Sequence, residues 1–156
     1  MSEPIIEQIA VKLETLINAI TVANGYNYDL SVVRPKRLFL EGDLYDDLNV
    51  VIEQGNCGSM AESNEIMIWS QEFSLQAICI DSDTATEPID TKRNKIRSDI
   101  EKKLMTDDNW LLNGLADGII LAGAEPFYLE NRIYGISVNI NVIYKTNTDN
   151  PYSQTN

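Results

Sequence analysis

Carboxylates are the most numerous side chains in this sequence that could do chemistry, with 24 Asp and Glu among 156 residues. They gather at residues 43–47 and 81–83, and closely spaced carboxylates suit calcium or magnesium. An EF-hand loop starting at Asp81 would need an oxygen ligand and then glycine where the chain has Ala85 and Thr86. The loop from Asp43 lacks the closing glutamate. Both groups are therefore interpreted as solvated turn acids, and no metal site is predicted.

Nucleophilic catalysis is restricted by the absence of histidine from the sequence. Ser-His-Asp and Cys-His arrangements and histidine metal sites are thereby excluded. Cys57 lies beside Gly55 and Gly58 in a candidate reactive position, but no imidazole can activate it. Phosphate-binding glycine loops and a Gly-x-Ser-x-Gly elbow are also missing. We expect no catalytic residue and no cofactor, although 24 acids always permit a pair of the kind that hydrolyses glycosides.

The charge balance argues against stable binding to nucleic acid. The 24 acidic and 12 basic side chains give a formal charge of −12, and the pI is near 4.3. Such a field repels a polyanion. Apolar residues make up 44% of the chain and charged residues 23%, as in ordinary globular domains. No apolar run is long enough to span a membrane, and two isolated cysteines, Cys57 and Cys79, indicate a reduced, cytosolic setting.

Two segments that must position these side chains have the apolar period of a helix. Residues 3–22 place apolar side chains on one face, with Ser2 as a candidate cap and Asn24-Gly25 as the stop. A second helix begins after Thr86-Glu87-Pro88 and ends near Met105. This second helix contains half of the 12 Lys and Arg, and residues 34–37 contain three more. A basic helix face of this kind is commonly just solvated, but it can also meet an acidic neighbour.

The remaining segments alternate with the period of strands, at residues 31–34, 48–54, 65–81, 117–127 and 136–145. Ile66 and Ile68 have the opposite parity to Phe73, which predicts a bulge or turn near Trp69 and Ser70. Residues 41–47 and 55–64 are predicted to be exposed loops, and residues 146–156 a polar tail. The fold class is α+β, in the order α-β-β-β-α-β-β: two amphipathic helices on one face of a mixed, mostly antiparallel sheet. Residues 1–145 form its single domain.

Several short phrases, taken in order, resemble the tail terminator proteins of tailed bacteriophages, the minor tail protein U type, also called tail-completion or neck proteins. The phrases are Glu-Pro-Ile-Ile-Glu at residues 3–7, Asn-Gly-Tyr-Asn at 24–27, Val-Val-Arg-Pro at 32–35, the acid-rich residues 81–91, Tyr-Lys-Thr at 144–146 and Asp-Asn-Pro-Tyr at 149–152. The resemblance extends from Glu3 to Tyr152. It rests on the order of elements and phrases, because the family has no enzymatic residues.

The resemblance implies a structural virion protein and not an enzyme. Such proteins form a six-membered ring that caps the tail tube and joins it to the head connector, with DNA passing through the lumen unbound. The implied partners are further copies of the chain, the tail-tube protein and the connector or stopper protein; the location is the virion neck, after assembly in the host cytoplasm. The candidate interface residues are Arg34, Lys36, Arg37, Lys92, Arg93, Lys95 and Tyr152.

Other functions stay open at this point. A head-completion or connector protein would contact the portal side of the same joint. A different class of function would be a small acidic inhibitor, which would bind a basic partner as a monomer, or a carboxylate-dependent hydrolase. The sequence leaves undecided whether the tail is contractile, which ring face meets which partner, and whether the ring forms before docking.

Overall fold

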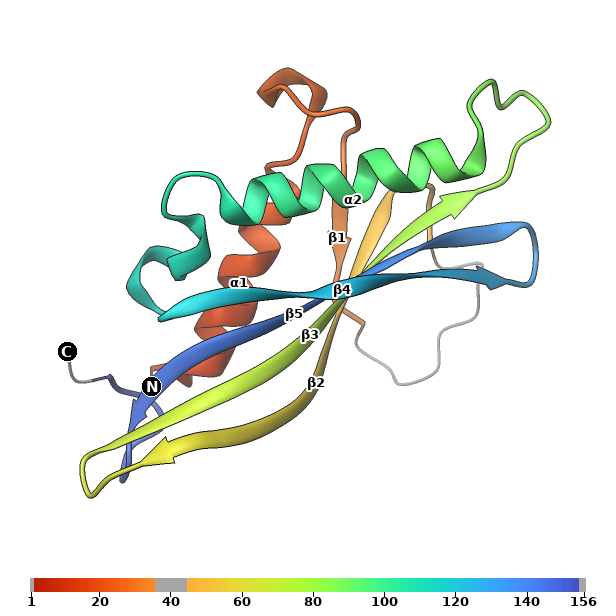
Figure 1. The fold of residues 1–156 in the computed structure, drawn as a ribbon. Helices are drawn as coiled ribbons and strands as arrows, with labels where there is room; N and C mark the ends of the chain where they lie inside the picture. The colour runs from red at the N-terminus through yellow and green to blue at the C-terminus, as the bar shows by residue number, and fades with distance from the viewer. Residues whose placement is uncertain (1, 36–44, 155–156) are drawn as a thin grey trace.

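The computed structural model describes residues 2–35 and 45–154. The helix α1 (Ile5–Asn18) comes first, followed by the short 3-10 helix η1 (Val22–Asn24) and the strands β1 (Ser31–Val33), β2 (Asn49–Glu62) and β3 (Ile66–Ile80). The helix α2 (Ile89–Met105) and the 3-10 helix η3 (Asn109–Gly114) lead to β4 (Gly118–Leu129) and β5 (Ile133–Asn147). The predicted fold class and element order are confirmed (Figure 1).

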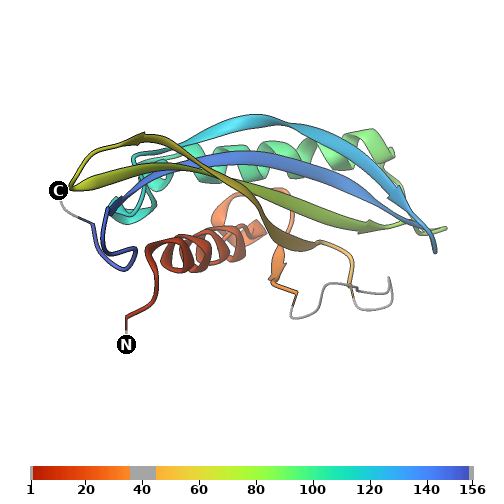
Figure 2. The ribbon, with the colours of Figure 1, turned by 90° about the horizontal axis from the view of Figure 1, so that it is seen from below.

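The five strands form one sheet in the order β1-β2-β3-β5-β4. Only the pair β1–β2 is parallel; the other three pairs are antiparallel. The strands β2 to β5 are long and twisted, and they arch over α1 in Figure 2. Such twist is the ordinary consequence of backbone sterics in L-residues.

Both helices cover the same face of the sheet, and the core lies between them and the strands. Alternate residues of each strand point into this core, among them Phe73 and Leu75 of β3 and Val138 and Ile140 of β5. From α1 the core receives Ile9, Leu13 and Ile17, and from α2 it receives Ile96, Ile100 and Leu104. The helix period of 3.6 and the strand period of 2 thus meet in one apolar layer.

The helix starts differ from the prediction at one point. Pro4 and Pro88 occupy the N-cap positions of α1 and α2, and neither helix has a side-chain cap. Ser2 is therefore not the cap of α1. The predicted helix over residues 3–22 is also shorter, because α1 ends at Asn18 and η1 is a separate turn. Gly25, which follows η1, has a φ of 92°. Glycine adopts this left-handed conformation without the steric cost that a side chain brings.

The predicted loop at residues 55–64 is wrong, because β2 continues through it to Glu62 and pairs with β3. The predicted bulge in β3 near Trp69 is wrong as well, since β3 pairs with β5 without interruption from Ile66 to Ile80. The irregularity lies on the facing strand. Register shifts between Gln54 and Cys57, and between Ser59 and Ala61, each place one extra residue on β2. Ile66 and Ile68 simply lie on the face of β3 that is away from the helices.

The end of the chain is folded against the domain and not a free tail over its described part. Thr146 and Asn147 continue β5. Ile5 N–H donates to the carbonyl of Pro151 at 3.1 Å, and the side-chain amide of Gln154 donates to the carbonyls of Leu115 and Lys145. Most of the predicted loop at residues 41–47 lies outside the described residues.

Candidate functional site

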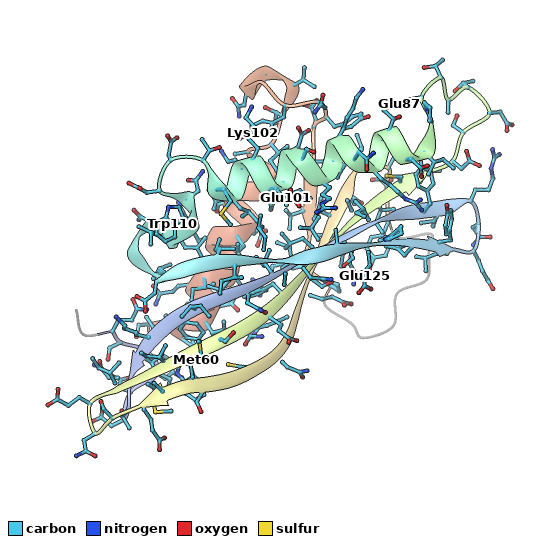
Figure 3. The ribbon with its side chains drawn as sticks, in the orientation of Figure 1. Met60, Glu87, Glu101, Lys102, Trp110 and Glu125 are labelled. Carbon is cyan, nitrogen blue, oxygen red and sulfur yellow. The ribbon has the colours of Figure 1, made fainter. Side chains whose placement is uncertain are left out.

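The face of the sheet that no helix covers carries a band of polar side chains across its middle, which we call the polar belt. Strand alternation places these residues opposite the core residues of the same strands. The polar belt consists of Glu53 of β2, Glu72, Ser74 and Gln76 of β3, Glu125 of β4, and Ser137, Asn139 and Asn141 of β5. Figure 3 labels Glu125 on β4.

Three neutral side chains of the polar belt, those of Ser74, Ser137 and Asn139, are bonded to one another. The Oγ atoms of Ser74 and Ser137 are 2.7 Å apart, and each lies 3.1 Å from Oδ1 of Asn139. Gln76 Nε2 donates to Glu53 Oε2 at 3.0 Å. These cross-strand contacts hold the middle of the sheet in register. They also leave the belt with three carboxylates, Glu53, Glu72 and Glu125, and no cation.

A shallow depression of about 380 Å³ lies within the polar belt. Glu53 and Glu72 lie on one side of it and Asn139 and Asn141 on the other. The described residues include no group of three or more side chains suited to hold a metal ion. A wet, acidic and amide-lined surface of this kind is repulsive toward phosphates.

Apolar residues flank the polar belt at both ends of the open face. At one end Val51, Ile78 and Ile133 form a second buried cluster with Phe127 and Tyr45 packed against it. At the other end Ile68, Ile143 and Ile120 occupy the same face. The only cation on this face among the described residues, Lys145, lies 3.4 Å from the carboxylate of Asp117. The open face is therefore acidic in the middle and apolar toward its ends.

The predicted interface residue Arg34 forms an ion pair within its own chain. Its guanidinium donates to both carboxylate oxygens of Glu7, at 2.8 and 3.1 Å, and so joins the end of β1 to α1. This bidentate bond from Arg34 lowers the pKa of Glu7 below its ordinary value. Lys36 and Arg37, the other two members of this cluster, lie outside the described residues.

The predicted interface residues Lys92 and Lys95 on α2 also pair with acids of their own chain. Lys92 Nζ lies 3.1 Å from Asp47 Oδ1, and Lys95 Nζ lies 2.6 Å from Glu87 Oε1. The Lys95 ammonium, together with Tyr28 O–H, lowers the pKa of Glu87. The two lysines thus hold the turn before β2 and the loop before α2 against the helix. Any partner would have to compete with these pairs.

The prediction of a surface contact at Arg93 is corrected by its burial, since only 6% of the residue is exposed. Its Nε donates to Gly135 O at 2.9 Å and its Nη2 to Phe127 O at 3.0 Å. The guanidinium also lies 4.4 Å from the ring centre of Tyr128. Arg93 therefore ties α2 to the β4–β5 pair. The signal was present in the sequence, because Arg93 falls on the apolar stripe that Ile96 and Ile100 continue.

The structure does not bring the predicted interface residues together at one place. Arg34 lies beside α1, the three α2 residues contact three different neighbours, and Tyr152 is an exposed residue of the C-terminal turn. What sequence reasoning missed is the polar belt. Its members come from four strands, and the residue pairs that join them are set by strand register, which the sequence does not state.

No protein-family model matches the chain, and no curated protein matches it. Within residues 2–35 and 45–154, no helix combines the length and the apolar character needed to cross a lipid bilayer.

Proposed function

We propose that this protein is a structural subunit of a bacteriophage neck, where copies of it form a ring, most simply a hexamer, that caps the tail tube and joins it to the head connector. The ring acts by shape and charge, without chemical turnover. Two things support the proposal: the resemblance of the sequence to tail terminator proteins, and an open sheet face that is acidic and bonded within itself.

The observation that carries the proposal is the charge of the polar belt. Glu53, Glu72 and Glu125 lie on it without a cation, and the one lysine on the same face is held by Asp117. A wall through which DNA passes must not hold phosphates, and carboxylates repel them. We place the polar belt at the lumen, where the copies of the ring together line the channel.

In this proposal the basic side chains reduce the repulsion between the acidic subunits of the ring. Ring subunits with a formal charge of −12 each repel one another. Arg34, Lys92 and Lys95 already lower the local charge by pairing inside each subunit. Lys36 and Arg37, the other members of the predicted cluster, lie outside the described residues, and in this proposal they meet acidic surface on a neighbour or on a partner protein.

Elongation of tail-tube protein tests the function directly. Purified tail-tube protein of the same phage is allowed to polymerise with and without this protein, and tube lengths are measured by negative-stain microscopy. A terminator stops the tubes and leaves a ring at their tips. If the tubes grow unchanged while the protein binds DNA-filled heads that lack tails, it is a head-side stopper and the terminator proposal is wrong.

Charge reversal tests the predicted partner surface. Arg34, Lys36 and Arg37 are changed together to Glu, and ring formation and head joining are measured. We expect both to be lost. The single variant Arg34→Glu is the control, because it replaces the pair with Glu7 by carboxylate repulsion and leaves Lys36 and Arg37 unchanged. Intact ring formation and head joining in the triple variant would show that this cluster is not an interface.

A further inference from the structure

The strand β4 forms one edge of the sheet and has an unprotected first half. Ile120 and Leu121 are 52% and 39% exposed, and strand alternation places them on opposite faces. Residues 118–124 contain no charged residue and no proline. Trp110, also partly exposed and labelled in Figure 3, packs beside Gly118 and extends the apolar surface. An apolar, uncharged edge of this kind pairs readily with another strand.

The second half of β4 carries the features that prevent such pairing. A register shift lies between Leu121 and Gly123, and Gly123 has a φ of 109°. Glu125 and Pro126 follow it. Bulges, charges and proline are the devices by which natural sheets block their edges. Only residues 118–121 of β4 are therefore left open.

The opposite edge of the sheet is divided in the same way. The strand β1 covers β2 only at Asn49, Val50 and Val51. Among residues 2–35 and 45–154, the rest of β2 pairs only with β3. Met60, at the far end of this uncovered part, is 61% exposed (Figure 3).

The open halves of the two edges lie at the same level of the sheet. Gly118 pairs with Ile143, which pairs with Ser70, which pairs with Gly58. In the same way, Leu121 pairs with Ile140, which pairs with Phe73, which pairs with Gln54. Residues 118–121 of β4 thus stand level with residues 54–58 of β2.

The blocked halves coincide as well. Pro126 pairs with Ile136, which pairs with Ala77, which pairs with Val50, a residue that β1 covers.

The directions of the two edge strands also suit a contact between copies. Three antiparallel steps separate β2 from β4, so β4 runs antiparallel to β2. A second copy placed beside the first in the same orientation would meet it with an antiparallel pair, the arrangement whose ladder is slightly more stable.

We propose that residues 118–121 of β4 pair antiparallel with residues 54–58 of β2 in a second copy, so that the sheet continues from subunit to subunit. Such a contact uses two different surfaces of the chain, and repeating it produces a ring when the rotation closes. That this pairing closes into a ring rests on the proposed function. The contact between two copies can be tested by itself.

A cysteine crosslink tests the pairing. Cys57 is exposed on β2, while Cys79 is buried. Cys57 lies near Tyr144 on the helix side of the sheet, and Leu121 points to the same side. In Leu121→Cys, a short bis-maleimide should join the new thiol to Cys57 of the next copy and produce a ladder of dimers, trimers and larger species. The variant is first compared with the wild type by thermal unfolding, to establish that it folds.

Two controls give the crosslink its meaning. Ile120→Cys places the thiol on the opposite face, so we expect at least a several-fold lower yield. In Leu121→Cys with Cys57→Ser the ladder should disappear. A dimer that persists without Cys57 would show that β4 pairs with itself, and this would overturn the proposal. So would the absence of any ladder, both at high protein concentration and on tube tips.

A charge on the edge provides a second measurement that needs no new thiol. Ile120→Lys should prevent assembly, whereas Val22→Lys, at a residue that is 58% exposed on η1, should not. Sedimentation reports the assembly state of each. Ring formation by Ile120→Lys at wild-type concentrations would overturn the edge pairing and leave the terminator proposal standing. A crosslinked ladder from a protein that never stops tube growth would do the reverse.

Discussion

Arg93 holds a positive charge inside the protein, and its surroundings explain how. The guanidinium donates to two strand carbonyls, of Gly135 and Phe127, and faces the ring of Tyr128. A buried cation of this kind is destabilising unless its donors are satisfied. Its partners belong to both strands of the β4–β5 pair, so one side chain sets where α2 lies on the sheet.

Replacing Arg93 should therefore destabilise the fold. We expect Arg93→Met to lower the free energy of unfolding by about 2 kcal/mol or more, because three hydrogen bonds to β4 and β5 are lost while the volume stays similar. Urea denaturation measures the difference. The control is Arg97→Met, which removes an exposed pair with Glu101 and should cost less than about 0.5 kcal/mol. Equal effects of the two changes would contradict the structural role of Arg93.

Gly135 is the glycine that packing requires most. A Cβ at this position would lie 2.0 Å from Ala77 O and 2.5 Å from Cζ of Phe127. We expect Gly135→Ala to lower the free energy of unfolding by about 3 kcal/mol, since overpacking at a backbone atom forces strand movement. Gly58→Ala is the matched control, because a Cβ there meets nothing within 4 Å. Should both variants unfold at the same urea concentration, the close approach at Gly135 is not real.

The two thiols should differ sharply in reactivity. Burial raises the pKa of Cys79 to about 11, whereas Cys57 is exposed. The thiolate is the reactive form, so we expect a maleimide to add once to the native protein and twice after unfolding. Mass spectrometry counts the adducts. Two adducts on the native protein would show that Cys79 is accessible.

At the scale of elements, ion pairs at the ends of helices and strands hold α1 and α2 to the sheet. Arg34 joins β1 to α1, and Lys92 joins α2 to the turn before β2. Each pair is partly exposed, so each contributes modestly to stability. The Arg34–Glu7 pair matters chiefly for where β1 lies, because β1 has only three residues that pair with β2.

The Glu7–Arg34 pair makes stability depend on pH on the acid side. A carboxyl group whose pKa is lowered by folding contributes stability above its ordinary value of 4.5 and loses it as pH falls through the lowered value. We expect Arg34→Gln to be less stable than the wild type by under about 1 kcal/mol near neutral pH. The difference should shrink as pH falls below 4.5 and vanish once the carboxyl group of Glu7 is protonated in the folded state. Urea midpoints across this range measure it, and a difference that grows toward acid would contradict the pair.

The helices and strands could be predicted because apolar period decides them, as the regular alternation of residues 136–145 shows. Residues 55–62 could not be predicted as a strand, because the Gly, Ser and Asn content of this segment is typical of a loop and only pairing with β3 makes it a strand. The ion-pair partners of the predicted interface residues could not be predicted either. Basic residues are visible in a sequence, but the acids that hold Lys92 and Lys95 are chosen by the fold.

At the scale of the whole molecule, the sheet has one face for the core and one for the surroundings. The negative charge of the second face is concentrated on the polar belt and not spread to its apolar ends. A channel wall built from such faces has little affinity for a passing duplex. The polar belt of an isolated subunit should also have little affinity for duplex DNA. The effect of its charge can therefore be measured in a DNA-binding experiment on the isolated subunit.

Reversing that charge should create affinity for DNA. We expect Glu53→Lys, Glu72→Lys and Glu125→Lys together to give salt-dependent binding of duplex DNA, measured by fluorescence anisotropy, where the wild type shows none. The control reverses three exposed acids elsewhere, Asp108, Glu130 and Asp149, and so also changes the formal charge from −12 to −6. Equal binding by both variants would show that net charge and not the polar belt governs DNA contact.

The hydrogen bond between Ile5 N–H and Pro151 O has a practical consequence. Because it brings the first helix against the last turn, a short peptide linker can join the two ends of the chain without crossing the sheet. New ends can then be opened in the exposed turn around Asp83, which precedes α2. Circular permutation of this protein should therefore preserve the domain while relocating its termini, so that a label can be attached beside α2 in place of the opening helix.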